Sequence, residues 1–288
     1  MDQLDEAGHA PIGLYSIGVD GERLDTISGA LKPPLRPPVG AFLVTAEEAL
    51  KRSSASLSLV ERLPVRSLLG PLFVARVASA GDVLLAGIRH RKDALLAKRA
   101  LLAQGATRLL LDGALDRRLA AHPALVDHVV LCTGYALAAD VATLCAQTAS
   151  ALERLRLPAA RPPHDAAQLD HWLPGRIPPA ESLERSALRL RGALTDEAAR
   201  RLLALRSAPA LWVPSPAHLL CSDSALRSLL LHLPSLSVEA KPQLLALVVN
   251  PYAADRGMLP RALLLDALRD VAAPTPCVDV TLAPLPLP

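Results

Sequence analysis

Aromatic residues are nearly absent from this sequence: Phe, Trp and Tyr together make up 2% of 288 residues. Proteins that bind single-stranded nucleic acid usually stack the bases on aromatic side chains, so this composition does not favour such a function. The formal net charge of +3 is also too small to indicate a nucleic-acid surface. Because hydrophobic residues still make up 51%, we expect an aliphatic core, which suits the layers of an α/β protein.

Cysteine is scarce and dispersed. Cys132, Cys145, Cys221 and Cys277 form no CxxC pair, so we expect four reduced, unpaired thiols. The eight histidines show no spacing typical of zinc ligands, and we expect no metal site. The chain begins with a polar, acidic stretch and has no uncharged apolar run of about 18 residues, which predicts a cytoplasmic protein without membrane contact.

Complete catalytic motifs are also missing. The sequence contains no phosphate-binding GxxxxGK[ST], no dinucleotide-binding GxGxxG, no GxSxG nucleophile motif and no HExxH zinc motif. The sequence therefore identifies no catalytic residue by motif.

Proline-rich stretches suggest how the chain is organised. Residues 158–182 contain six prolines, which restrict helices and remove strand hydrogen-bond donors. We see no internal repeat. We expect an irregular but β-rich N-terminal segment over residues 1–40, a first α/β region over 41–157, a linker or long loop over 158–182, a second α/β region over 183–282 and a tail over 283–288.

The order of periodic segments predicts an α/β fold with a mainly parallel sheet and helices on both faces. A helical pattern over residues 92–104 is followed by apolar strands over 108–113 and 128–134. Continuous apolar runs predict that the last two are central strands, covered on both faces. Thr45, three residues before Glu48, is a candidate helix N-cap.

Four apolar strands end in a polar or turn residue: Asp112, Thr133, Ser215 and Asn250. In open parallel sheets ligands bind beyond the carboxyl ends of the strands, so these residues would share one rim if their strands are neighbours. Strands also commonly end in such residues because turns need them. Both interpretations stay open.

The densest polar segment follows the strand over 108–113. It places Asp112, Asp116, Arg117 and Arg118 together, with His122 shortly after. A carboxylate followed by arginines suits a phosphate or metal–phosphate ligand. The same residues suit an ion-paired loop that packs a helix.

This segment carries a resemblance. The sequence LLLDGALDRRLAAHPALVDHVVLCTGYALAADV resembles the KamB family, the reactivase subunits encoded beside the cobalamin-dependent lysine 5,6-aminomutase. The family pattern is an apolar strand, D-G-A-[LI]-[DS]-R, a Pro and an Asp, then a second strand and T-G-A. The letters agree at Gly70, Gly87, Asp112, Gly113, Asp116, Arg117, Pro123, Asp127, Thr133, Gly134 and Asn250. The chain departs at Ile88-Arg89, where the family has P-S, and at Tyr135, where it has Ala.

The resemblance implies an accessory protein without catalytic activity of its own. With a MutS-like ATPase partner it would help an aminomutase exchange damaged cobalamin, so cobalamin is the client's cofactor and ATP acts through the partner. The alternatives are a small-molecule or phosphate-handling enzyme that uses the rim around Asp112 and Thr133, and a scaffold whose ancestral site has decayed. The candidate binding residues are Asp112, Gly113, Asp116, Arg117, Arg118, Thr133, Gly134 and Asn250.

Overall fold

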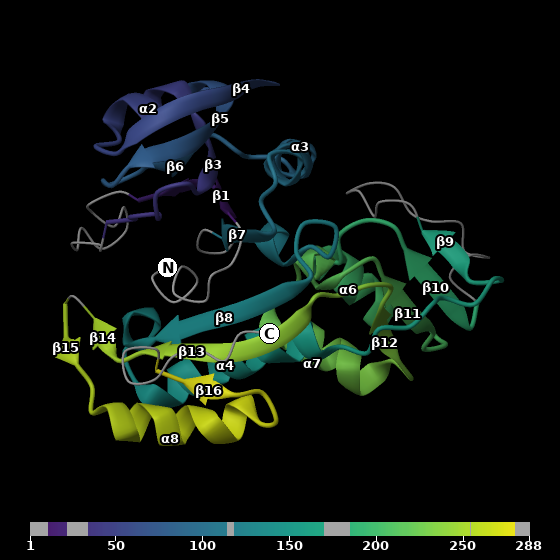
Figure 1. Cartoon of the computed structure of the whole chain (residues 1–288). Helices are drawn as coiled ribbons and strands as arrows, with labels where there is room; N and C mark the ends of the chain where they lie inside the picture. Colours follow the sequence, from purple (N-terminus) through teal and green to yellow (C-terminus); the bar gives the residue numbers. More distant parts are fainter. Residues whose placement is uncertain (1–10, 22–33, 114–117, 170–184, 254, 280–288) are drawn as a thin grey trace. The chain divides into compact units, whose positions relative to one another are not determined.

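The computed structural model describes residues 11–21, 34–113, 118–169, 185–253 and 255–279 (Figure 1). Over these residues the protein is a mixed α/β protein with several sheets, some of them parallel. The chain forms two compact units, unit 1 with Met1–Ala120 and Ala124–Val126, and unit 2 with Ala121–Pro123 and Asp127–Pro288.

The division between the units does not fall in the proline-rich stretch over 158–182, where the sequence predicted it. Residues 158–169 lie within unit 2, and residues 170–184 lie outside the described part. Prolines mark an irregular path of the backbone, whereas a boundary depends on which segments pack together.

Unit 1 is built on a five-stranded sheet of order β4-β5-β3-β1-β7. β1 (Ile12–Ile17) is parallel to both of its neighbours, β3 (Phe42–Ala46) and β7 (Arg108–Gly113). β5 (Gly70–Ser79) and β4 (Ser56–Ser67) extend the sheet as antiparallel strands.

The strand β1 agrees with the β-rich part of the prediction for residues 1–40 and corrects the irregular part over Ile12–Ile17. All six residues of β1 are buried, and the strand lies in the interior of the sheet. IGLYSI is too short to show a period of its own. Its partners begin about 30 and 95 residues later along the chain, so local pattern did not reveal it.

Apolar residues cover both faces of this sheet. On one face α3 (Arg91–Ala103) packs against Tyr15, Ile17 and their neighbours. On the other face β6 (Leu85–Ala86), which pairs with β2 (Val19–Asp20), contributes to the cluster together with Leu50 of α2 (Glu47–Arg52). The expected helical cover is therefore complete on one face only.

Thr45 does not cap a helix, contrary to the prediction. The N-cap of α2 is Ala46, which makes no side-chain capping bond. The buried Thr45 Oγ1 instead donates to the carbonyl of Leu84 (2.8 Å) and accepts from the amide of Ala86 (2.9 Å). A strand side chain thus satisfies the backbone of β6.

Unit 2 contains a three-stranded parallel sheet of order β16-β13-β8. Its strands are β8 (His128–Gly134), β13 (Gln243–Asn250) and β16 (Cys277–Val278). Helices α4 (Val141–Arg156) and α8 (Arg261–Ala272) pack on it through a leucine cluster. A short turn, η2 (Tyr135–Leu137), follows β8, and the hairpin of β14 (Tyr252–Ala253) and β15 (Gly257–Met258) follows β13.

The prediction of residues 109–111 and 129–131 as central strands is wrong. β7 and β8 are edge strands, and they belong to different sheets. Leu110 and Val130 accordingly retain 39% and 36% exposure. An apolar run identifies a strand, but its position in a sheet depends on partners that the run does not specify.

Unit 2 also contains a second, four-stranded parallel sheet whose strands follow one another in chain order. These are β9 (Ala167–Leu169), β10 (Ala187–Leu190), β11 (Ala210–Val213) and β12 (Leu236–Val238). Helix α6 (Asp196–Leu203) connects β10 to β11, and α7 (Asp223–His232) connects β11 to β12. We call this assembly the repeat stack.

The repeat stack reveals an internal repeat that the sequence analysis missed. Leu188, Leu211 and Leu236 are paired in register, at intervals of 23 and 25 residues along the chain. One strand and one helix per interval of this length are typical of solenoid repeats, including the leucine-rich type. The unequal intervals hide the period in the sequence.

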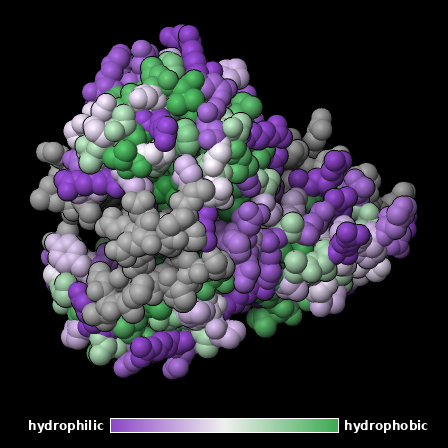
Figure 2. Space-filling model, viewed as in Figure 1, coloured by the Kyte–Doolittle hydropathy of each residue, from purple (hydrophilic) through white to green (hydrophobic). Residues whose placement is uncertain are grey.

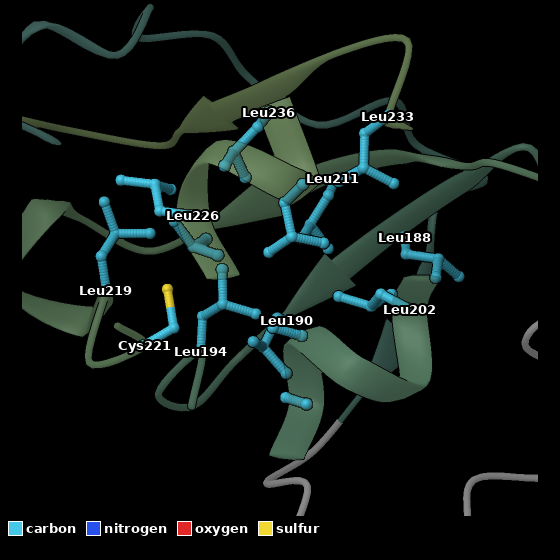
Figure 3. Close-up of a cluster of buried hydrophobic side chains, with 14 of the residues drawn as sticks. Leu188, Leu190, Leu194, Leu202, Leu211, Leu219, Cys221, Leu226, Leu233 and Leu236 are labelled. Atoms are coloured by element: carbon cyan, nitrogen blue, oxygen red, sulfur yellow. The ribbon is translucent and has the colours of Figure 1, made fainter. Parts of the chain in front are cut away.

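Leucines fill the space between the strands and helices of the stack (Figure 3). Leu188 and Leu211 from the strands meet Leu202 of α6 and Leu226 of α7 in one cluster. Burial of one large aliphatic side chain contributes about 1.5–3 kcal/mol, so this cluster is the main source of stability of the stack.

Arg154 ties α4 to the repeat stack. Its side chain is almost fully buried and donates to the carbonyls of Ser150 (3.0 Å) and Cys221 (3.0 Å). It also contacts the hydroxyl of Ser150 and forms an ion pair with Asp223 (2.7 Å).

We expect Arg154→Met to lower the free energy of unfolding by about 1–3 kcal/mol, because the carbonyl of Cys221 loses its charged donor. Asp223 is half exposed, so water compensates its lost ion pair in part. Urea unfolding measures the change. The control is Arg269→Met, which removes an exposed pair with Asp266 and should have little effect. Equal losses in the two variants would contradict this role of Arg154.

Candidate functional site

The carboxyl ends of β1 and β7 form the first candidate site. Ser16 is paired in register with Asp112, and Ile17 with Gly113. From β1 the chain moves to β3 on one side, whereas β7 lies on the other side, so the strand order reverses here. Such a switch point is where open α/β sheets bind ligands.

Ser16 was not found by sequence reasoning. It is 1% exposed, and its Oγ has no hydrogen-bond partner among the described residues. Neighbours in parallel register point to the same face, so Ser16 and Asp112 lie side by side, Ser16 buried and Asp112 exposed. A serine inside an apolar strand carries no signal that would have distinguished it.

The structure describes only part of the DGALDRR segment. Asp112 and Gly113 end β7, while Asp116 and Arg117 lie outside the described residues. Arg118 begins the short helix η1 (Arg118–Ala121). A Cβ on Gly113 would lie 2.6 Å from the Cβ of Ala120, so glycine allows the chain to return close to the end of β7.

Thr133, Gly134 and Asn250 lie together at the carboxyl ends of β8 and β13. Gly134 is paired in register with Asn250, and Thr133 with Val249. A Cβ on Gly134 would lie 2.4 Å from the carbonyl oxygen of Asn250, so the close approach of the strands requires glycine. Asn250 Oδ1 accepts from the amide of Tyr252 (3.0 Å), which forms the turn after β13.

Thr133 faces the interior of unit 2. Its hydroxyl lies 2.9 Å from that of Thr148 on α4, and both residues are buried. This hydrogen bond satisfies the buried hydroxyl of Thr133, so its presence at the end of β8 needs no ligand to explain it.

The predicted common rim is wrong. Asp112 ends a strand of the unit 1 sheet, Thr133 and Asn250 end strands of the three-stranded sheet, and Ser215 follows β11 of the repeat stack. The buried Ser215 Oγ lies 2.8 Å from Nδ1 of His218. Each residue lies at or just after the carboxyl end of a parallel strand, but the strands belong to three sheets.

The polar side chains around the start of α4 form hydrogen bonds with other groups of unit 2. Asp140 accepts from the amide (2.8 Å) and the hydroxyl (2.7 Å) of Thr143, and these bonds hold the pKa of its carboxyl below the usual range. Arg256 donates to the carbonyl of Tyr135 (3.0 Å) and lies 4.6 Å from the centre of its ring. Tyr135 thus holds the β14–β15 hairpin through Arg256.

Within the described ranges, His, Cys, Asp and Glu form no group of three or more that could hold a metal ion. Burial raises the pKa of the Cys145 and Cys277 thiols, which lowers the fraction of reactive thiolate. None of the helices seen in the described part of the chain is long and apolar enough to cross a membrane.

The protein is therefore a mixed α/β protein of two units, and the second unit contains the strand–helix repeat. A comparison with protein-family models, curated proteins and solved structures finds no match to this chain.

We expect Thr133→Val to destabilise the protein by about 1–2 kcal/mol, because the buried hydroxyl of Thr148 loses its partner. Adding Thr148→Val should recover much of this loss, since neither hydroxyl is then left unpaired. Urea unfolding of both single variants and the double variant measures the coupling. Strictly additive losses would show that the two hydroxyls do not depend on each other.

Proposed function

We propose that this chain is a reactivase-like accessory subunit that helps an adenosylcobalamin-dependent aminomutase exchange damaged cofactor, together with a MutS-like ATPase partner. The family resemblance around Asp112, Gly113, Thr133 and Gly134 points to this client. The structural observation that supports it best is the repeat stack, because stacked strand–helix repeats provide extended surfaces for protein contacts.

Such a protein acts through differential binding. If the subunit binds the open, cofactor-free aminomutase better than the closed one, it shifts the population towards the form that releases damaged cobalamin. ATP turnover by the partner then resets the complex. In this scheme cobalamin stays the client's cofactor, and the chain needs no covalent chemistry.

Asp112 and Gly113 are suited to a contact surface. The backbone that carries them is paired to the buried strand β1 over the whole length of β7. A charged side chain carried by a paired strand, as Asp112 is, has its backbone already ordered, which reduces the entropy lost on binding.

A second candidate is a small-molecule or phosphate-binding protein that uses the ends of β1 and β7. The observation in its favour is the buried, unpartnered Oγ of Ser16 beside Asp112 at the switch point. Binding of ATP by the purified chain alone, measured by calorimetry, would favour this candidate over the accessory subunit.

Reconstitution tests the proposed function. Inactivated aminomutase is incubated with fresh adenosylcobalamin, ATP, the MutS-like ATPase and this chain. We expect activity to recover only in the complete mixture. Equal recovery without the chain would overturn the proposal.

We expect Asp112→Asn and Arg117→Ala to slow this reactivation at least about tenfold, equivalent to about 1.4 kcal/mol of lost contact, while the melting temperature changes little. The control is Glu61→Gln on the exposed strand β4, which should leave the rate unchanged. Loss of stability in parallel with activity would instead identify DGALDRR as a structural turn.

A further inference from the structure

Helix α3 in unit 1 carries two stripes of side chains on opposite sides. The inner stripe is buried against the sheet and consists of Ala94, Ala97 and Leu101. The other stripe consists of Lys92, Leu96, Arg99 and Leu102. Its members are four, three and three residues apart, so they lie along one side of the helix. Both cations are exposed, and Leu102 is 47% exposed. We call this second stripe the outer stripe.

The outer stripe lies in a strongly basic part of the chain. Residues 89–99 contain one carboxylate, Asp93, which is buried, and five cations: Arg89, Arg91, Lys92, Lys98 and Arg99. Arg89, Lys92 and Arg99 form no ion pair within the described part of the chain. The whole chain has a net charge of only +3, so positive charge is concentrated here. Hydrophilic residues cover much of the surface seen in Figure 2, so the sign of the charge, rather than polarity, distinguishes this helix.

The positions of these cations do not stabilise α3. Arg91 and Lys92 lie in the first turn, where the helix dipole is positive, and the last turn has no basic residue. Helices α2 and α6 have the opposite order, with acidic residues in the first turn and basic residues in the last. A charge order that is unfavourable to its own helix is expected where the side chains contact a partner.

The spacing of the outer stripe fits a second helix. Side chains three and four residues apart form the ridges that interlock when two helices pack. Leu96 and Leu102 provide apolar contacts, which the phosphates of a nucleic acid or a lipid would not use. Lys92 and Arg99 are two turns apart, about 10 Å along the axis, and so match carboxylates two turns apart on the facing helix.

We propose that the outer stripe is a docking surface for an acidic amphipathic helix of a partner protein. Its apolar side chains pack on Leu96 and Leu102, and its carboxylates lie opposite Lys92 and Arg99. Opposite charges speed the encounter and select the partner, while the apolar contacts slow its release. The inference goes beyond the proposed function, because it assigns a contact surface that holds whichever protein supplies the helix.

The probe is a synthetic helical peptide of about three heptads, with Leu at positions a and d and Glu at positions e and g. Its binding to the full chain is measured by calorimetry. A control peptide carries Gln in place of every Glu. We expect the Glu peptide to bind at least about tenfold more tightly than the Gln peptide, and to lose most of this advantage at about 0.5 M salt.

Charge reversal locates the site. We expect Lys92→Glu/Arg99→Glu to weaken binding of the Glu peptide at least about tenfold. The matched control is Arg62→Glu/Arg66→Glu, which makes the same change of charge on the exposed strand β4 and should alter affinity less than about threefold. Leu102→Ser should weaken binding at least about threefold, because it removes an exposed apolar contact.

Folding of the variants is checked by their melting temperatures. Lys92→Glu places a carboxylate in the first turn of α3, which favours the helix, so a loss of binding in a variant with an unchanged melting temperature comes from the surface itself.

Absence of binding of the Glu peptide to the folded chain overturns the proposal, and so does an equal loss of affinity in the two double variants. Tighter binding of a single-stranded oligonucleotide or of anionic lipid vesicles through Lys92 and Arg99 would assign the stripe to phosphate groups and overturn it. A dimer of the chain that Lys92→Glu/Arg99→Glu dissociates would assign the stripe to a second copy, with the same consequence.

Discussion

Packing of aliphatic side chains between parallel strands and helices holds both units of this protein together. With aromatic residues at 2%, the interior depends on leucine, valine and alanine. These aliphatic side chains fill the space between the strands and the helices that pack on them. The repeat stack shows this most clearly, since Leu188, Leu211 and Leu236 occupy equivalent positions in successive strands. One side of its sheet is thereby committed to the leucine core.

Buried polar groups mark the joints between these layers. Lys241 donates to the carbonyl of Leu157 at the end of α4 (2.6 Å), and burial lowers the pKa of its amine. Arg156 reaches the carbonyls of Val271 (3.3 Å) and Ala272 at the end of α8. The cations satisfy helix carbonyls that lack a partner within their own helix. In addition to the leucine packing on the sheet, these helix ends connect α4 with α8 and with the segment after the repeat stack.

The individual elements were largely predictable. The strands over 108–113 and 128–134 match β7 and β8, and the helix over 92–104 matches α3 within one residue at each end. Ser222 is the N-cap of α7 and accepts from the amide of Ala225 (3.3 Å), which is the local pattern expected at a helix start. These signals are local, since capping and helical periodicity involve residues a few positions apart. The candidate site was predictable only in its parts: Thr133 and Asn250 proved to be neighbours, while Asp112 and Ser215 end strands of other sheets.

The sequence by itself determined an aliphatic α/β protein, the positions of four of the parallel strands and of helix α3, and the polar residues near the ends of those strands. Only the tertiary structure decided that β1 lies inside a sheet, that β7 and β8 lie at edges, and that β9 to β12 form one sheet in chain order. The reason is physical. Side-chain periodicity records which residues of a segment are buried, but strands pair through backbone hydrogen bonds that every residue except proline can make. Strand order therefore follows from how the whole chain packs, and no single segment specifies it.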